Sequence, residues 1–162
     1  RVIAPRRGPG VPARALNGVV GLLVGRLGIP LPGVRMLRVH GRRTGRLRSV
    51  PVMVLRLDGR RYLVAPRGAT DWAANLRSAG WGELRRGRRS ERVRATPVHG
   101  DERARAVAAY VRRFGWLTGR FFDLPRRPTV DEARVVADRH PVFLVAHDPR
   151  PVGGRVPGEH AT

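Results

Sequence analysis

Residues 37–51 read LRVHGRRTGRLRSVP and place two segments of strand character on either side of a short, arginine-rich turn. Arg42, Arg43 and Thr44 stand between two glycines, and we call residues 41–46 the arginine turn. Glycine lets a backbone approach a ligand closely, and arginine offers paired donors that match phosphate and carboxylate oxygens. The stretch therefore predicts an anion-binding turn between two antiparallel strands.

Alternating apolar and polar residues predict a mostly antiparallel sheet of about six strands. The expected strands lie at residues 34–40, 48–57, 62–65, 84–89, 92–98 and 141–146. In the first of these, Leu37 and Val39 share one face. Asp58 and Gly59 give a strong hairpin signal, and a turn this tight joins antiparallel strands only.

Helices are expected between these strands, which makes the predicted fold class α+β and most simply a barrel with flanking helices. Thr70 stands where it can cap a helix that Gly80 ends, and Thr129 and Glu132 form a capping box. The expected helices lie at residues 15–27, 70–79, 101–114 and 129–139.

The predicted organisation is one folded domain with extensions at both ends. Residues 1–14 are expected to be a disordered leader, 15–32 an N-terminal helix, 33–147 the cofactor-binding domain and 148–162 a flexible tail. The apolar run at 15–31 is short for a membrane span and contains Arg26, so a packed helix is favoured. Peripheral contact of this run with a membrane surface stays open.

Composition narrows the class of protein. The 162 residues include 33 basic side chains, all arginine, against 12 acidic ones, for a net charge of +21. The absence of lysine indicates codon bias, which weakens the usual inference from charge to nucleic acid and favours a local anionic ligand. The absence of cysteine excludes disulfides, thiolate catalysis, zinc–thiolate sites and iron–sulfur clusters, and a cytoplasmic location is compatible with it.

No familiar catalytic pattern is found among the side chains. The five histidines are scattered without paired carboxylates, no serine stands in a nucleophile context, and Walker and GxGxxG motifs are absent. We therefore expect no catalytic residue and no metal site. An enzyme with such a sequence would bind and orient a reactive cofactor.

A second motif follows at residues 65–76, which read APRGATDWAANL. A strand ends, a glycine-containing loop follows, and a helix begins near Thr70, so its free N–H groups can meet an anion or a polarised carbonyl. Trp72 is placed to stack on a ring and Asn75 to bond to it. Alternatively, Trp72 belongs to the core and Asn75 faces solvent. Together with the arginine turn, the motif is better explained as the second wall of one pocket.

The two motifs, in this order, resemble the deazaflavin-dependent nitroreductases, which belong to the flavin/deazaflavin oxidoreductase superfamily of split β-barrels. The resemblance rests on GRRTG at 41–45, RSVP at 48–51, APRG at 65–68 and DWAANLR at 71–77. It implies a split β-barrel that binds reduced coenzyme F420. It also implies hydride transfer from this coenzyme to a small-molecule acceptor of the nitro, quinone or enone type.

The resemblance also assigns a role to each part of the two motifs. The arginine turn and the start of the next strand would hold the phosphate of the coenzyme, and that strand would line the deazaflavin ring. The loop of the second motif would meet the polar edge of the ring through backbone groups, and its helix would close the phosphate and tail side. In that order, the residues are Arg42, Arg43, Thr44, Arg48 and Ser49; Val50, Pro51, Val52 and Met53; Ala65, Pro66, Arg67 and Gly68; and Asp71, Trp72 and Asn75.

The chain departs from the family pattern in two places. Arg43 replaces a lysine that is frequent in the turn, and no acceptor-side tyrosine can be placed, because residues 117–124 offer only Phe121 and Phe122. FMN, FAD or another flavin-like or tetrapyrrole ligand stays open as the alternative cofactor, and a homodimer stays open as well. An arginine-rich nucleic-acid-binding protein is the less favoured alternative, because only 6% of the residues are aromatic.

Overall fold

A computed structural model describes residues 32–151 of the chain. The predictions for residues 1–14 and 15–31, and for the end of the tail at 152–162, lie outside this part. Within 32–151, no helix has both the length and the apolar character needed to cross a membrane.

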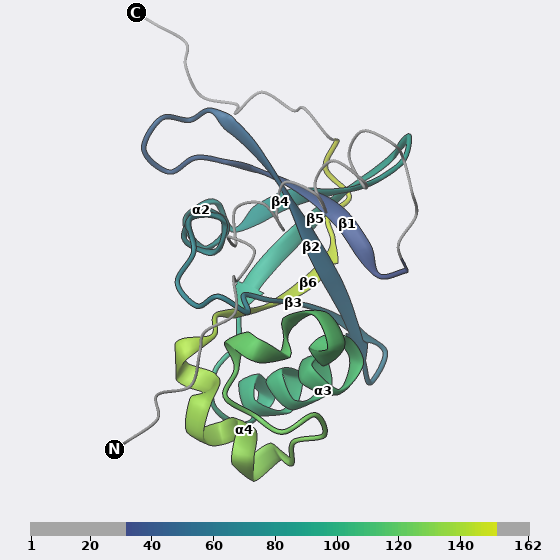
Figure 1. Ribbon diagram of the computed structural model, residues 1–162. Coiled ribbons are helices and arrows are strands. Elements are labelled where there is room, and N and C mark those ends of the chain that lie inside the picture. Colours follow the sequence, from purple (N-terminus) through teal and green to yellow (C-terminus); the bar gives the residue numbers. More distant parts are fainter. Residues whose placement is uncertain (1–31, 152–162) are drawn as a thin grey trace, which may run out of the picture.

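Six strands close into an antiparallel barrel, which confirms the predicted fold class (Figure 1). Their order around the barrel is β1-β2-β3-β6-β5-β4. The strands are β1 Val34–His40, β2 Leu47–Leu57, β3 Arg60–Val64, β4 Trp81–Arg86, β5 Arg89–Pro97 and β6 Val142–His147. β4 begins earlier than predicted, because the chain leaves a helix at Gly80 and Trp81 at once pairs with Arg94.

Within residues 32–151, three α-helices accompany the barrel: α2 Asp71–Ala79, α3 Gly100–Thr118 and α4 Val130–Val136. Figure 1 shows α3 and α4 packed together on one side of the barrel, whereas α2 lies apart from them, near the turn between β1 and β2. Short 3₁₀ turns follow α3 at Gly119–Phe121 and α4 at Ala137–Arg139. The barrel is therefore flanked by helices that come from distant parts of the sequence.

The helix ends correct two details of the prediction and confirm a third. The capping box is present, because the Thr129 hydroxyl accepts from the Glu132 N–H and the Glu132 carboxylate accepts from the Thr129 N–H. Thr70 occupies the N-cap of α2, yet its hydroxyl makes no capping bond. α3 extends past its predicted end at Phe114 to Thr118, whose hydroxyl donates to the Phe114 carbonyl at 3.0 Å.

Alternation along the strands divides the core into two clusters. Leu63 and Phe143 belong to a cluster that also takes in α2, whereas their neighbours Tyr62 and Val142 pack with α3 and α4. The barrel wall is close-packed at Gly82, where an added Cβ would lie 2.9 Å from Leu37 Cδ1. One set of strand side chains thus packs with α2, and the alternating set packs with α3 and α4.

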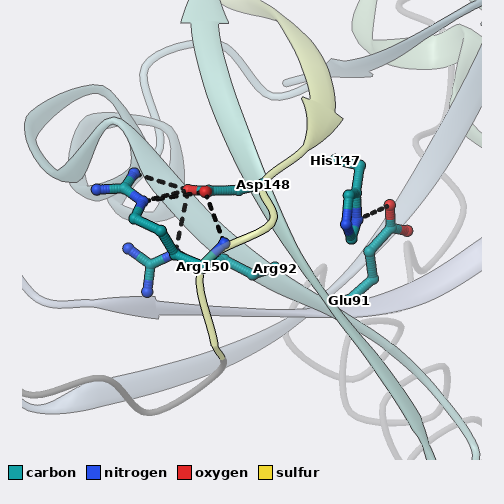
Figure 2. Close-up of polar contacts among 5 residues, drawn as sticks. All are labelled: Glu91, Arg92, His147, Asp148 and Arg150. Atoms are coloured by element: carbon teal, nitrogen blue, oxygen red, sulfur yellow. Dashed lines mark hydrogen bonds and ion pairs between the residues drawn. The ribbon is translucent and has the colours of Figure 1, made fainter.

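A buried ion pair holds the chain that leaves β6 (Figure 2). Arg92 Nε donates to Asp148 Oδ2 at 3.1 Å, Arg150 donates to the same carboxylate, and the Arg92 guanidinium lies 3.6 Å from the centroid of the Trp81 ring. These contacts, with Arg150 the strongest, hold the pKa of Asp148 well below its usual value. Asp148 is only 1% exposed, so the packed domain continues past its predicted end at residue 147.

Candidate functional site

The two motifs border a single cavity of about 620 Å³. One wall is the arginine turn together with β2, and the other is the loop after β3 together with the start of α2. Most of the predicted site residues line it: Arg42, Arg43, Thr44, Arg48, Val50, Pro51, Val52, Met53, Pro66, Arg67, Asp71, Trp72 and Asn75. Tertiary folding therefore brings together segments that the sequence keeps apart.

The arginine turn is closed by its own backbone. The Gly41 N–H donates to the Arg46 carbonyl at 2.8 Å, and the Gly45 N–H donates to the Gly41 carbonyl at 2.8 Å. Gly45 adopts a positive φ of 66°, which favours glycine at this position. The turn thus satisfies these backbone groups internally, and Arg42, Arg43 and Thr44 line the cavity.

Asn75 joins the arginine turn to α2. Its Oδ1 accepts from the Arg42 backbone N–H at 3.1 Å and from Arg42 Nη1 at 3.0 Å, and Arg42 Nη1 also lies 3.3 Å from Asp71 Oδ1. Asn75 is only 6% exposed, so the alternative that it faces solvent is wrong. The Arg42 guanidinium is thus directed at α2 and fixes the turn against the helix.

Other arginines face the cavity without a protein counter-ion. Arg43, Arg48, Arg67 and Arg120 line it and are exposed, and within residues 32–151 none of them forms an ion pair. Trp72 lines the same cavity while its ring lies 6.2 Å from that of Phe143 in the core, so it borders both the cavity and the core. The cavity combines uncompensated positive charge with aromatic and aliphatic surface.

The loop at 65–68 uses much of its hydrogen-bonding capacity on itself. The Gly68 N–H donates to the Ala65 carbonyl at 3.1 Å, and the Thr70 N–H donates to the Gly68 carbonyl at 2.8 Å. Neither Ala65 nor Gly68 lines the cavity, whereas Pro66 and Arg67 do. No partner for the Arg67 N–H is found in the described part of the chain, so this group is the loop donor left for a ligand.

His140 contacts this loop through the Ala65 carbonyl. Its Nδ1 lies 3.2 Å from the Ala65 carbonyl, and its ring lies 4.3 Å from that of Phe122. Burial lowers the pKa of His140 below its usual value, which keeps the ring neutral near pH 7. Because a carbonyl accepts, the proton of the neutral ring is assigned to Nδ1.

Ser49 lies outside the cavity lining. It sits on β2 opposite Arg38 and is exposed, between two residues, Arg48 and Val50, that do line the cavity.

Sequence reasoning missed the wall that α3 and its following turn supply. Tyr110 lines the cavity although it is only 2% exposed, and its ring lies 5.1 Å from that of Phe114. Its spacing from Val107 and Phe114 on the helix was a signal that could have found it. The remaining lining residues that were not predicted are Val34, Gly41, Val64, Thr70, Leu117, Thr118, Arg120 and Phe121.

Two polar groups of this cavity have notable surroundings. Burial strongly raises the pKa of Tyr110, and the nearby Thr118 hydroxyl offsets only a smaller part. The Thr70 hydroxyl is buried and has no hydrogen-bond partner within the described residues.

No group of three His, Asp or Glu side chains arranged to hold a metal ion occurs in residues 32–151.

Comparison with known proteins identifies the family and the fold. A family model described as F420H(2)-dependent quinone reductase matches residues 13–115, which is more than half of the chain. A search of curated proteins found no significant match. The chain shares its fold with the heme storage protein HutZ from Vibrio cholerae, at 11% identity over 73% of this chain and 83% of that one, with a TM-score of 0.51.

Two further solved structures match with comparable TM-scores. An F420-H2 dependent reductase, FDR-A, is 21% identical over 71% of this chain and 95% of that one, with a TM-score of 0.49. A hypothetical protein from Mycobacterium tuberculosis is 14% identical over 96% of this chain and 100% of that one, with a TM-score of 0.49.

Proposed function

Because the chain belongs to the F420H(2)-dependent quinone reductase family and is thus an F420-dependent oxidoreductase, we propose that the cavity between the two motifs binds this coenzyme. The observation that carries the proposal is the cavity itself, in which arginines without protein counter-ions adjoin the apolar strand β2. F420 combines a planar ring with a phosphate and a carboxylate tail. The donor set of the cavity therefore fits the charge and the shape of the group.

Arg43, Thr44 and Arg48 hold the phosphate in this proposal. All three line the cavity, and the two guanidinium groups are free of carboxylate partners within the described chain. Charge-assisted hydrogen bonds of this kind are about twice as strong as neutral ones. Arg42 and Asn75 act as positioning residues, because the bonds between them fix the arginine turn against α2.

The deazaflavin ring lies along β2, between residues 50–53 and the loop that carries Arg67. Val50, Val52 and Met53 supply apolar surface, and the Arg67 N–H is a donor for the polar edge of the ring. When bound in its reduced form, F420 supplies the hydride. The chain holds the coenzyme and the acceptor next to each other and excludes water from between them. Both effects lower the free-energy barrier to hydride transfer.

The acceptor occupies the side formed by α3 and its following turn. Tyr110, Leu117 and Phe121 line this side and suit a planar apolar molecule. A phenol is protonated near pH 7, and burial raises the pKa of Tyr110 further, so this side chain can donate a hydrogen bond to an acceptor oxygen. A quinone fits the family description, and nitro and enone compounds carry similar oxygens.

Fluorescence titration with F420 tests the cofactor site. Arg43→Ala should weaken binding by about 1–3 kcal/mol, or roughly 5- to 150-fold, because a charge-assisted contact is lost. Arg46→Ala is the matched control, since Arg46 belongs to the same exposed turn but does not line the cavity. Equal losses in both variants would show that only general charge matters.

Two further measurements test the alternative cofactor and the choice of acceptor. A protein that purifies with bound FMN or FAD and does not quench F420 fluorescence would refute the F420 site. With F420 reduced, turnover is compared for a soluble benzoquinone, a nitroarene and a cyclic enone, and we expect the quinone to react fastest. A homodimer and membrane contact through residues 15–31 stay predictions of the sequence.

A further inference from the structure

A second cavity, also of about 620 Å³, is lined by residues that the first cavity does not use. It lies between α3 and the strands β1 to β5 that border it. Its lining contains a single acidic residue, Glu91. The basic lining residues are Arg35, Arg56, Arg61, Arg86, Arg89 and Arg113.

The strand register sets these arginines directly against one another. Arg56 pairs with Arg61 across β2 and β3, and Arg86 pairs with Arg89 across β4 and β5. Like charges at directly opposite positions destabilise a sheet. Codon bias accounts for abundant arginine, but it does not account for two such pairs that meet at one hollow.

Glu91 compensates only one of these arginines, Arg61. Arg61 donates two hydrogen bonds of 2.7 Å to its carboxylate. On the same carboxylate, His147 Nδ1 lies 3.3 Å from Oε1, as Figure 2 shows. The Arg61 bond is the main cause that lowers the pKa of Glu91 below its usual value. The one acidic group of the cavity is therefore shared between two neighbours.

The remaining guanidinium groups lack acidic partners within residues 32–151. No ion pair is formed by Arg56, Arg86, Arg89 or Arg113 in this part of the chain. The pKa of Arg35 is lowered by burial first and then by the charges of Arg86, Arg56 and Arg61, and Glu91 opposes this only as the smallest contribution. Both observations indicate positive charge that the folded chain leaves uncompensated.

We propose that this second cavity binds a small anion carrying two or more phosphate or carboxylate groups, separately from the cofactor. Several guanidinium groups around one hollow match a ligand with several anionic groups, since each guanidinium favours bidentate contact. The volume lies within the range of small-molecule sites. This binding site goes beyond the proposed hydride transfer and does not depend on it.

Isothermal titration calorimetry of the full chain, with inorganic triphosphate and with citrate at constant ionic strength, tests this site. We expect one equivalent of at least one probe to bind, and the preferred probe identifies phosphate or carboxylate as the recognised group. The double variant R86Q/R89Q should bind it at least about tenfold more weakly, because charge-assisted hydrogen bonds are lost. The matched control is R126Q/R127Q, which removes the same charge from two exposed residues outside the cavity.

Titration with F420 provides two controls. It shows whether the double variant is folded, and whether the second cavity binds its ligand independently of the first. We expect R86Q/R89Q to bind F420 with unchanged affinity, and F420 not to displace the bound triphosphate or citrate. Three results would overturn the proposal: no binding of either probe, equal weakening in both double variants, or competition between the probe and F420.

Discussion

Replacing Asn75 by alanine should weaken F420 binding indirectly. The Asn75 amide does not contact the phosphate in our proposal, but it fixes the arginine turn that does. The variant removes the acceptor of two hydrogen bonds, one from the Arg42 backbone N–H and one from its guanidinium. Net values are about 0.5–1.5 kcal/mol for a neutral bond and about 1.5–3 for a charged one. Because the Arg42 side chain is 30% exposed, we take the lower part of this range, about 2 kcal/mol. Because both bonds exist in the free protein as well, the affinity falls by at most this amount, about 30-fold, which is reached when binding must re-order the whole turn.

The assay is fluorescence titration with F420, combined with hydrogen exchange of the Arg42 amide in the unliganded protein. We expect faster exchange in N75A, because this amide loses its acceptor. Ser78→Ala, an exposed position on the same helix, serves as the control and should leave both values unchanged. Wild-type affinity in N75A, or weaker binding with unchanged exchange at Arg42, would refute the positioning role.

Three further predictions concern stability, measured by urea unfolding. Asp148 has a folded pKa below its usual 3.8, so its stabilising contribution is present above that pH and is lost on acidification. From about pH 5 to about pH 2, D148N should therefore lose stability less steeply than the wild type, and equal slopes would contradict this. His140 has a folded pKa below its usual 6.5, so protonation favours the unfolded chain. Stability should fall as the pH drops below about 6.5, and H140Q should lack this loss; an identical pH profile would argue against a buried neutral ring. Gly82→Ala should cost about 1–3 kcal/mol through overpacking against Leu37, whereas Gly119→Ala, with nothing near its Cβ, should be tolerated; similar midpoints would contradict the close packing.

Local patterns were sufficient to predict the elements of the fold. Alternation identified β1 and β2, Asp58 and Gly59 identified the hairpin to β3, and Thr129 with Glu132 identified the start of α4. These signals act over a few residues, so the sequence displays them directly. The boundaries of β4 and α3 were less accurate, because strand pairing and packing against the barrel decide where those elements begin and end.

The candidate site was predicted in part. The arginine turn and the loop at 65–68 were found because glycine, arginine and proline mark such segments locally. The wall that contains Tyr110 was missed, because its side chain is buried among apolar residues and carries no local sign of a binding function. The engagement of Arg42 with α2 was missed as well, since its partner Asn75 is distant in the sequence.

The sequence by itself determined the strands, the charge of the arginine turn and the resemblance to deazaflavin-dependent enzymes. Only the tertiary structure decided which arginines have partners. Arg42 is held by Asn75, whereas Arg43 and Arg48 face the cavity without a carboxylate among the described residues. The physical reason is that an arginine binds a ligand through charge that the protein has not already compensated, and compensation depends on contacts between distant parts of the chain.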